Sequence, residues 1–222
     1  MIFIGLTGGI GSGKSTVAAA LAARGAVIVD SDALVRDLQQ PGAAIFVGMV
    51  DHFGPRIVAA DGTLDRAAVA GIVFNDEAEL KALNRIVHPA VMAETMARVA
   101  AHRDTDTVVV LDIPLLVEGR RDDGTLLYPV DGVIVVDVPV DVAVARLVEH
   151  RGFTEDDARA RIANQASRRR RIEIADVVID NSGTVDRLEA QVDAAWEWAQ
   201  RVEPDVEERS AGRSATTIEE PR

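Results

Sequence analysis

A glycine-rich stretch near the start of the chain, GGIGSGKST at residues 8–16, constrains the fold more than any other feature of the sequence. It directly follows the apolar segment IFIGLT and directly precedes an Ala-rich helical pattern. Glycine weakens both strands and helices, so its density here calls for a physical reason. The spacing Gly8-x-x-x-x-Gly13-Lys14-Ser15 supplies one, because it is the pattern of a phosphate-binding loop, or P-loop, between a strand and a helix.

The residue types of this loop suit the phosphates of a nucleoside triphosphate. Glycines let consecutive backbone N–H groups turn toward phosphate oxygens, and the start of the following helix adds the positive end of its dipole. The ammonium group of Lys14 can reach the β- and γ-phosphates, and the hydroxyl of Ser15 can bind Mg²⁺. The alternative is a glycine-rich turn without a ligand, but strand, loop and helix follow one another here as a P-loop requires. The predicted nucleotide-binding residues of the loop are Gly8, Gly9, Gly11, Ser12, Gly13, Lys14, Ser15 and Thr16.

Segments rich in valine and isoleucine predict parallel strands that are covered on both faces, because they are nearly continuous in apolar residues rather than alternating. Helical patterns lie between them, and this alternation predicts an α/β fold with a doubly wound parallel sheet of about five strands. The predicted strands are residues 2–7, 26–30, 107–112, 132–138 and 176–180. The predicted helices are residues 14–24, 32–39, 43–53, 65–73, 76–87, 89–102, 139–150, 155–171 and 184–201.

The order of these segments also predicts how the chain is divided. Residues 31–103 contain only helical patterns and turns, which indicates an insertion that caps the sheet or holds a substrate. Turn residues mark 119–129 as a surface loop, and the polar, aperiodic end at 202–222 is interpreted as a disordered acidic tail. The nucleotide-binding core is therefore predicted at residues 1–30, 104–145 and 172–201.

The composition argues against several classes of partner. A net charge of −12 disfavours nucleic acid, which usually needs a basic surface. Apolar runs such as VVVLDIPLLV are interrupted, here by Asp112 and Pro114, so no segment is expected to span a membrane. The chain holds no cysteine and shows no secretory signal. We therefore expect a cytoplasmic protein that binds neither nucleic acid nor a membrane.

Two aspartates after the second predicted strand, Asp30 and Asp32 in VIVDSDALV, are candidate catalytic groups. Ligands of open parallel sheets collect beyond the carboxyl ends of the strands, which places both carboxylates near the γ-phosphate. A kinase needs a carboxylate to accept the proton of the acceptor hydroxyl, and Asp32 is the candidate for this role. Asp32 would also suit the N-terminus of a helix, so a structural role stays open at this point.

Further candidates are an acid after the third predicted strand and a set of arginines. Asp112 ends TVVVLD, the place where P-loop proteins hold the acid that binds the metal directly or through water, and Glu118 lies on the loop that follows. Arg146 and Arg151 flank a short loop and could stabilise the charge on a transferring phosphoryl group. The arginines at 168–171 are interpreted as a solvated basic face or as partners of a helix dipole.

Motifs in a fixed order resemble those of the dephospho-coenzyme A kinase family: GLTGGIGSGKS, DSD, LDR, LNRIVHP, DIPLLVE and IDNSG. The resemblance covers about residues 2–200, and the combination is far more specific than any single motif. It implies a transferase that uses ATP and Mg²⁺ to phosphorylate the ribose 3′-hydroxyl of dephospho-coenzyme A, the last step of coenzyme A synthesis. It also implies a P-loop NTPase-type fold with a helical substrate subdomain at 31–103 and a helical lid at 146–171.

The resemblance assigns roles to single residues. Arg66 in LDR would contact substrate phosphates, although it could equally be a surface helix residue. His88 and Pro89 match a family pattern, for which a turn that joins two helices is the simpler interpretation. Ser31 and Val117 depart from the residues usual in the family, but neither change removes a reacting group. The predicted roles are catalysis for Asp32, Lys14 and Arg146, ATP binding for Arg151, substrate binding for Asp32, Arg66 and His88, and metal binding for Ser15 and Asp112.

Two alternatives to this family remain on the sequence alone. Another small-molecule kinase, of the nucleoside-monophosphate or shikimate type, would share the P-loop and the lid but not the HP and DIPLL motifs. A nucleotide-dependent switch such as a GTPase would select guanine with an Asn-Lys-x-Asp stretch, where this chain reads DNSG. The expected partner is the small molecule dephospho-coenzyme A, bound by a monomer or a small homo-oligomer.

Overall fold

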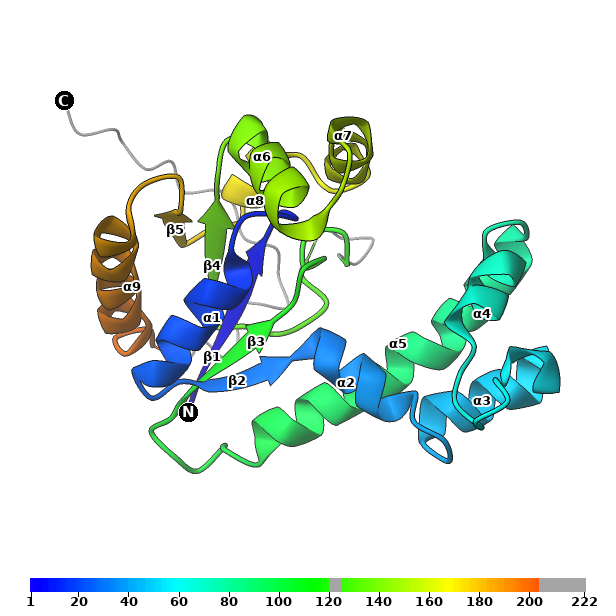
Figure 1. The fold of residues 1–222 in the computed structure, drawn as a ribbon. Helices are drawn as coiled ribbons and strands as arrows, with labels where there is room; N and C mark the ends of the chain where they lie inside the picture. Colours follow the sequence, from blue (N-terminus) through cyan, green and yellow to red (C-terminus); the bar gives the residue numbers. More distant parts are fainter. Residues whose placement is uncertain (120–124, 204–222) are drawn as a thin grey trace. The chain divides into compact units, whose positions relative to one another are not determined.

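A computed structural model describes residues 1–119 and 125–203, and it contains one five-stranded sheet (Figure 1). The strands are β1 (Ile2–Gly8), β2 (Val27–Asp30), β3 (Val108–Asp112), β4 (Gly132–Asp137) and β5 (Val177–Asp180). They lie in the order β2-β3-β1-β4-β5, with β1 paired in parallel to both β3 and β4, and β4 paired in parallel to β5. The predicted parallel α/β fold of about five strands is confirmed.

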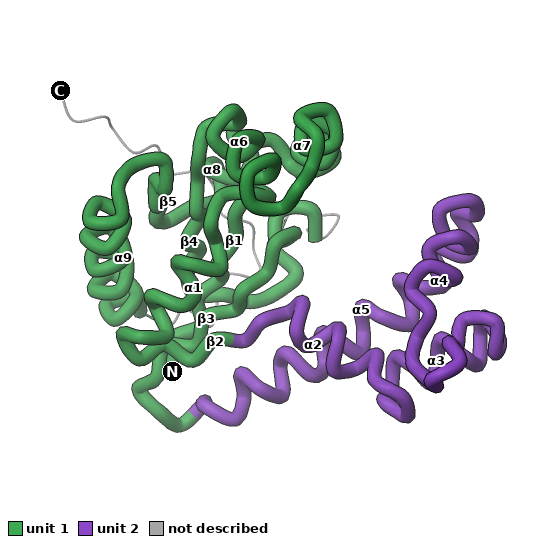
Figure 2. Tube along the Cα trace, in the orientation of Figure 1, with its two compact units in different colours: residues 1–28, 104–222 green, residues 29–103 purple. Residues whose placement is uncertain are grey.

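The chain forms two compact units, which Figure 2 shows in different colours. The sheet unit comprises residues 1–28 and the described residues from 104 onward, and the helical unit comprises residues 29–103. The helices of the sheet unit are α1 (Lys14–Ala23), α6 (Val140–Arg151), α7 (Glu155–Ala163), α8 (Arg168–Ile172) and α9 (Val185–Ala199). The helical unit holds α2 (Ser31–Leu38), α3 (Ala44–Phe53), the 3₁₀ turn η1 (Pro55–Ile57), α4 (Arg66–Val73) and α5 (Glu77–Ala100).

The functions assigned to ranges of the chain, a substrate subdomain at 31–103 and a lid at 146–171, stay predictions. Residues 120–124 of the predicted surface loop and residues 204–222 of the predicted acidic tail lie outside the described residues. Within the described part of the chain, no helix is long and apolar enough to cross a membrane.

The core of the sheet unit fixes the strand that leads into the glycine-rich loop. Ile4 and Leu6 of β1 are fully buried in one apolar cluster with Leu21 of α1 and Val192 of α9. The helices α1 and α9 contact each other, and α1 also contacts β1 (Figure 1). A strand that is paired on both edges and buried on both faces has little freedom, which accounts for its nearly continuous apolar sequence. The loop after it therefore starts from a rigid point.

The helical unit has a core of its own, arranged along α5. The helices α2, α3 and α4 all contact α5. Ile45 and Met49 of α3 and Ile57 of η1 are fully buried, and Val91 of α5 belongs to the same cluster. This separate core explains why an insertion between two strands of the sheet folds as a compact unit.

Three predicted helices differ from those observed. Residues 76–87 and 89–102 do not form two helices joined by a turn at His88 and Pro89, because α5 is continuous and Pro89 lies inside it. A proline inside a helix removes one backbone hydrogen bond, but packing against three neighbouring helices outweighs this local preference.

The predicted helix at 155–171 is also wrong, because it is split into α7 and α8. Ser167 is the N-cap of α8, and its hydroxyl accepts a hydrogen bond from the Arg170 N–H at 3.3 Å. A side chain that caps a new helix ends the pattern that would otherwise continue. The other predicted strands and helices begin and end within two residues of those observed.

The packing of Gly132 at the start of β4 gives a test of the sheet-unit core. A Cβ atom there would lie 2.5 Å from Cη2 of Trp198, so Gly132→Ala should lower the free energy of unfolding by about 1–3 kcal/mol through overpacking. Gly71 in α4 has no heavy atom within 4 Å of a built Cβ, so Gly71→Ala should instead raise it by about 0.5–1 kcal/mol. Urea unfolding followed by circular dichroism measures both changes. Equal effects at the two sites would contradict this account of the packing.

Candidate active site

The glycine-rich loop runs from the end of β1 to the first turn of α1 and is closed by its own backbone. The Ser12 N–H donates to the carbonyl of Gly9 at 3.0 Å, and the Thr16 N–H donates to the carbonyl of Gly13 at 3.0 Å. Gly11 and Gly13 have φ angles of 79° and 84°. A residue with a Cβ atom adopts this left-handed region only at a cost, so the backbone path requires glycine at both positions.

Four backbone N–H groups of the loop are available to a ligand. Among the described residues, the N–H groups of Gly11, Gly13, Lys14 and Ser15 have no hydrogen-bond acceptor. The N–H of Ile10, in contrast, donates to Oε1 of Gln165 at 2.9 Å. Lys14 and Ser15 stand in the first turn of α1, where the helix itself offers no acceptor. Free donors at the N-terminus of a helix form a site for an anion, as the motif predicts for phosphate.

An ion pair between Lys14 and Asp112 borders the loop. Asp112 ends β3 and is 7% exposed, and its carboxylate accepts a hydrogen bond from Nζ of Lys14. The pairing of β1 with β3 sets this meeting, since Leu6 of β1 lies opposite Asp112, two residues before the first glycine of the loop. The pair leaves neither charge alone in a largely buried place.

Ser15 and Asp112 fit the ligands that Mg²⁺ takes in kinases. This ion is usually held by one or two carboxylates together with substrate phosphates and waters. Ser15 is exposed in the first turn of α1 and offers its hydroxyl, and Asp112 offers its carboxylate. The described residues contain no group of three or more His, Cys, Asp or Glu that could hold a metal without a nucleotide. This donor set suits an ion that is bound together with ATP.

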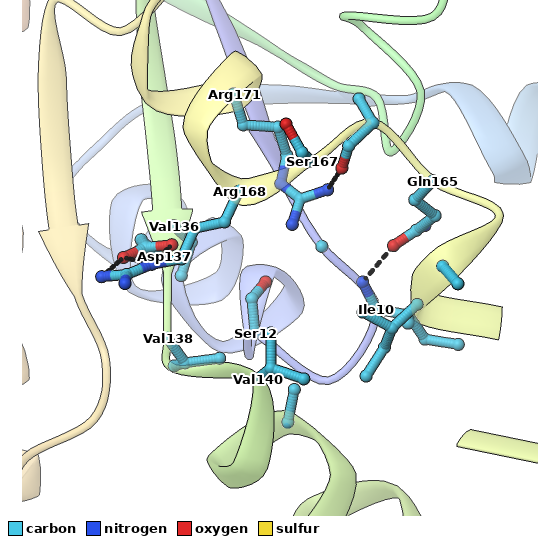
Figure 3. A pocket seen from close by; sticks show the side chains of 15 residues that line it. Ile10, Ser12, Val136, Asp137, Val138, Val140, Gln165, Ser167, Arg168 and Arg171 are labelled. Carbon is cyan, nitrogen blue, oxygen red and sulfur yellow. Dashed lines mark hydrogen bonds and ion pairs between the residues drawn. The ribbon is translucent and has the colours of Figure 1, made fainter. Parts of the chain in front are cut away.

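A cavity of about 270 Å³ lies beside the loop (Figure 3). It is lined by loop residues, by residues at and after the end of β4, and by the segment that joins α7 to α8. Ser12 borders this cavity, and its buried Oγ has no hydrogen-bond partner within the described residues. A polar atom in this position is available to a ligand or to an ordered water.

Arg168 and Arg171 of α8 also line this cavity (Figure 3). Arg168 pairs with the buried carboxylate of Asp137, with its Nε and Nη2 at 2.8 Å and 2.6 Å from Oδ2, and these hydrogen bonds raise the pKa of Arg168. Arg171 lies against the loop, because a Cβ on Gly9 would be 2.7 Å from its Nη2, and burial lowers the pKa of Arg171. The interpretation of residues 168–171 as a solvated basic face is therefore wrong for Arg171, which is partly buried, whereas Arg168 is half-exposed.

Arg146 also lies at the loop, as the structure of the sheet unit shows. From the middle of α6, its Nη2 donates to the carbonyl of Asn181 at 2.7 Å, and its Nη1 lies 3.5 Å from the carbonyl of Ser12. Arg151 is exposed at the C-terminal end of α6. The catalytic role of Arg146 and the ATP-binding role of Arg151 stay predictions.

The remaining predicted site residues belong to the helical unit. Asp30 is the N-cap of α2, where its side chain accepts a hydrogen bond from the Ala33 N–H at 2.9 Å, and Asp32 is exposed in the first turn. Arg66 is the exposed first residue of α4, and His88 is exposed within α5. Their roles as base and as substrate ligands stay predictions.

Three residues that contact the loop are not predicted from the sequence: Gln165, Arg171 and Asn181. For Arg171 a signal was present, because Ser167 is a favourable N-cap residue in the middle of a helical pattern. A helix that starts there places Arg168 and Arg171, three positions apart, on the same face. Gln165 and Asn181 have no comparable local signal.

Arginines on helices beside a P-loop are typical of small-molecule kinases. In these enzymes such side chains close over the transferred phosphoryl group. The sheet unit has this arrangement, with Arg146 from α6 and Arg171 from α8 next to the loop. We therefore place the chain in the class of P-loop kinases.

Comparison with known proteins gives the family within this class. The family model for dephospho-CoA kinase matches residues 2–187. The dephospho-CoA kinase of Thermobifida fusca is 48% identical over 201 residues, which cover 90% of this chain and 98% of that protein. The dephospho-CoA kinase of Symbiobacterium thermophilum is 47% identical over 197 residues, which cover 88% of this chain and 80% of that protein. The chain belongs to the dephospho-CoA kinase family, and the resemblance seen in its motifs is confirmed.

Solved structures share the fold of this chain. The crystal structure of TT1252 from Thermus thermophilus is 33% identical with a TM-score of 0.73, and the match covers 89% of this chain and 97% of that one. The dephospho-CoA kinase of Campylobacter jejuni, 19% identical with a TM-score of 0.61, shares the fold, over 89% of this chain and 96% of that one. Membership of the family confirms the predicted class of enzyme, an ATP-dependent transferase of coenzyme A synthesis with Mg²⁺, and decides against the other kinases and the switch.

The pair of Arg168 and Asp137 gives a stability prediction. Arg168→Ala leaves the Asp137 carboxylate, which is 7% exposed, without its partner. We expect the free energy of unfolding to fall by about 1–2 kcal/mol, and not by more, because solvent at the half-exposed arginine screens the pair. Arg169→Ala is the matched control, because Arg169 is 88% exposed in its pair with Glu173 and its loss should leave stability unchanged. Urea unfolding followed by tryptophan fluorescence measures both. Equal losses in the two variants would mean that Asp137 does not depend on Arg168.

Proposed function

We propose that this chain transfers the γ-phosphoryl group of ATP to the ribose 3′-hydroxyl of dephospho-coenzyme A, which gives coenzyme A and ADP. The observation that carries the proposal is the P-loop with its available N–H groups and its Lys14–Asp112 pair, in a chain of this family. In the reaction, a bond forms between the 3′-oxygen and the γ-phosphorus while the bond from that phosphorus to the β,γ-bridging oxygen breaks. The proton of the hydroxyl passes to a base, and ADP leaves.

Lys14 and Asp112 are proposed to exchange partners when ATP arrives. The Lys14 ammonium would leave the carboxylate for the β- and γ-phosphates, where it neutralises charge. Asp112 would then hold Mg²⁺ together with the Ser15 hydroxyl. The bound ion supplies further charge neutralisation on the phosphate oxygens. The ion pair of the structure supports this exchange, because each charge moves from one partner to another rather than standing alone.

Arginines of the sheet unit are proposed to stabilise the charge that spreads over the transferring group. Arg146 and Arg171 both contact the loop, from α6 and from α8. A guanidinium offers several donors in a fixed plane, which suits phosphate oxygens better than a single ammonium does. Arg151, at the exposed end of α6, is proposed to join them on the nucleotide when the segment after it closes.

Asp32 is proposed as the general base, and Arg66 and His88 are proposed to bind dephospho-coenzyme A. The cap of α2 is Asp30, so Asp32 is not needed for capping. Its carboxylate has no hydrogen-bond partner within the described residues and is exposed, which keeps it free to accept a proton. A cationic Arg66 suits a substrate that carries phosphates.

The role of Asp32 is tested by removing its charge. Asp32→Asn should lower kcat by roughly 10²- to 10⁴-fold, the range typical of a general base, while the affinity for ATP survives. Asp37→Asn, which changes another exposed carboxylate of the same helix, is the matched control and should leave kcat unchanged. Steady-state kinetics and calorimetric titration with Mg-ATP provide the two measurements. An unchanged kcat in Asp32→Asn would refute its assignment as the base.

The role of Arg171 is tested against its exposed neighbour. Arg171→Ala should lower kcat/KM for ATP by about 10²-fold, because it removes a charged donor beside the phosphates. Arg170→Ala changes an exposed arginine of the same short helix and should keep the activity of the unmodified chain. The outcome that contradicts the proposal is an equal, small effect in both variants.

The reaction itself is tested by an assay of ADP release with dephospho-coenzyme A as acceptor. Fast release with dephospho-coenzyme A, and none with shikimate or a nucleoside monophosphate, is the expected result. Fast release with one of the other acceptors would overturn the proposed substrate.

We further propose that the chain acts in the cytoplasm, as a monomer or a small homo-oligomer. The charged nature of ATP and dephospho-coenzyme A supports the location, because neither crosses a bilayer unaided.

A further inference from the structure

Asn181, the first residue after β5, connects the end of this strand to the P-loop. It is 8% exposed, and its side-chain Nδ2 donates to the carbonyl of Ser12 at 2.8 Å. Its backbone N–H donates to the carbonyl of Asp137 at 2.9 Å, which continues the pairing of β5 with β4. The side chain is therefore held at a known place relative to the loop by its own backbone.

The hydrogen bond to Ser12 fixes the direction of the next N–H group in the loop. A trans peptide is planar, and its C=O and N–H point in opposite directions. Because Asn181 binds the Ser12 carbonyl, the N–H of Gly13 in the same peptide points away from the Asn181 side chain. This N–H is among those that have no acceptor within the described residues. The Asn181 side chain thus fixes the direction of the Gly13 N–H, a donor that can bind phosphate.

Gly13 and Asn181 are matched to each other in space. A Cβ atom built on Gly13 overlaps Nδ2 of Asn181, so any side chain at Gly13 would displace the carboxamide. The glycine of the Gly-Lys pair is therefore needed here for two reasons, its left-handed φ of 84° and the room that Asn181 occupies.

Asn181 also holds the arginine that is placed nearest to the loop from α6. Its backbone carbonyl accepts a hydrogen bond from Nη2 of Arg146 at 2.7 Å, while Nη1 of the same guanidinium lies 3.5 Å from the Ser12 carbonyl. Asn181 and Arg146 therefore converge on one carbonyl oxygen of the loop.

The residues beside Asn181 keep it rigid. The carboxylate of Asp180 accepts hydrogen bonds from the N–H of Ser182 at 3.0 Å and from its hydroxyl at 2.6 Å. The side chain of Gln191 on α9 accepts from the Asp180 N–H at 2.9 Å and donates to the Asp180 carbonyl at 2.8 Å. Locked neighbours of this kind hold a positioning group within the small tolerance that a site requires.

We propose that Asn181 is a positioning residue for phosphoryl transfer, which orients the Gly13 N–H toward the phosphates of ATP and holds Arg146 beside them. The proposal rests on the proposed kinase function. It assigns the IDNSG motif a role through its asparagine side chain, separate from any contact that its backbone makes with the nucleotide.

The test is the Asn181→Asp variant, which keeps the shape of the side chain but replaces the donor by an oxygen that repels the Ser12 carbonyl. We expect KM for ATP to rise about tenfold and kcat to fall, while KM for dephospho-coenzyme A stays within about twofold. Asn75→Ala is the matched control, since its Nδ2 also donates to a backbone carbonyl at 2.8 Å, but on an exposed turn of the helical unit. This control should leave KM for ATP unchanged.

A coupling measurement separates positioning from a purely structural role. The combined loss in Asn181→Ala with Arg146→Ala should be smaller than the product of the two single losses, because both side chains act on the same carbonyl. Thermal melting of every variant reports its stability. Unchanged kinetics with a lowered melting temperature would mean that Asn181 is structural, and fully independent losses would mean that the two side chains do not act together on the Ser12 carbonyl. Either result overturns the proposal.

Two further measurements keep the proposal testable if Asn181→Asp does not fold. Asn181→Ser shortens the side chain without adding charge and should give the same rise in KM for ATP. In the unmodified protein, the side-chain NH₂ signals of Asn181 in NMR should exchange slowly with water, and fast exchange would refute the hydrogen bond. Calorimetry with Mg-ATP and no acceptor gives the ratio of Kd values for the variants. A protein that binds Mg-ATP but does not phosphorylate dephospho-coenzyme A would refute the proposed function, whereas equal Kd values would refute the role of Asn181.

Discussion

Parallel pairing of β1 with β3 on one side and β4 on the other is the constraint on which the site of the sheet unit depends. It brings the carboxyl ends of neighbouring strands to one edge, where the P-loop begins. Asp112 ends β3, Asp137 ends β4, and the residue after β5 meets Ser12. These groups come from distant parts of the chain, yet each has its place because a strand ends there. The loop itself adds only glycines that let its backbone follow a tight path.

Positively charged side chains gather around the loop, although the net charge of the whole chain is negative. The protein has 36 acidic and 24 basic residues, but Lys14, Arg146, Arg168 and Arg171 all lie near the loop or the cavity beside it. Two of these cations are paired with strand-end carboxylates. Net charge describes how the surface as a whole meets other macromolecules, whereas a small polyanion meets only a few side chains. An acidic protein can therefore bind a highly charged nucleotide.

Much of this arrangement could be predicted from the sequence, and the failures have physical causes. The strands and the P-loop follow from local patterns, and Asp112 follows from its place at a strand end. The continuous α5 and the split at Ser167 were missed because tertiary packing and a cap overrode the periodicity. The contact of Asn181 with Ser12 joins residues 169 positions apart, and no local pattern encodes such a meeting. The role of Asp32 in the reaction stays a prediction, made from its place after a predicted strand and from the family motif.

Pro89 gives the longest helix an uneven stiffness along its length. Within the 24 residues of α5, this position has no N–H to offer the carbonyl of Arg85, one turn earlier. Bending the helix axis there breaks no hydrogen bond, whereas bending elsewhere along α5 strains an intact ladder. The helix α5 is therefore easiest to bend at the turn that precedes Pro89, and we expect any bending of this helix to concentrate there rather than to spread along its length.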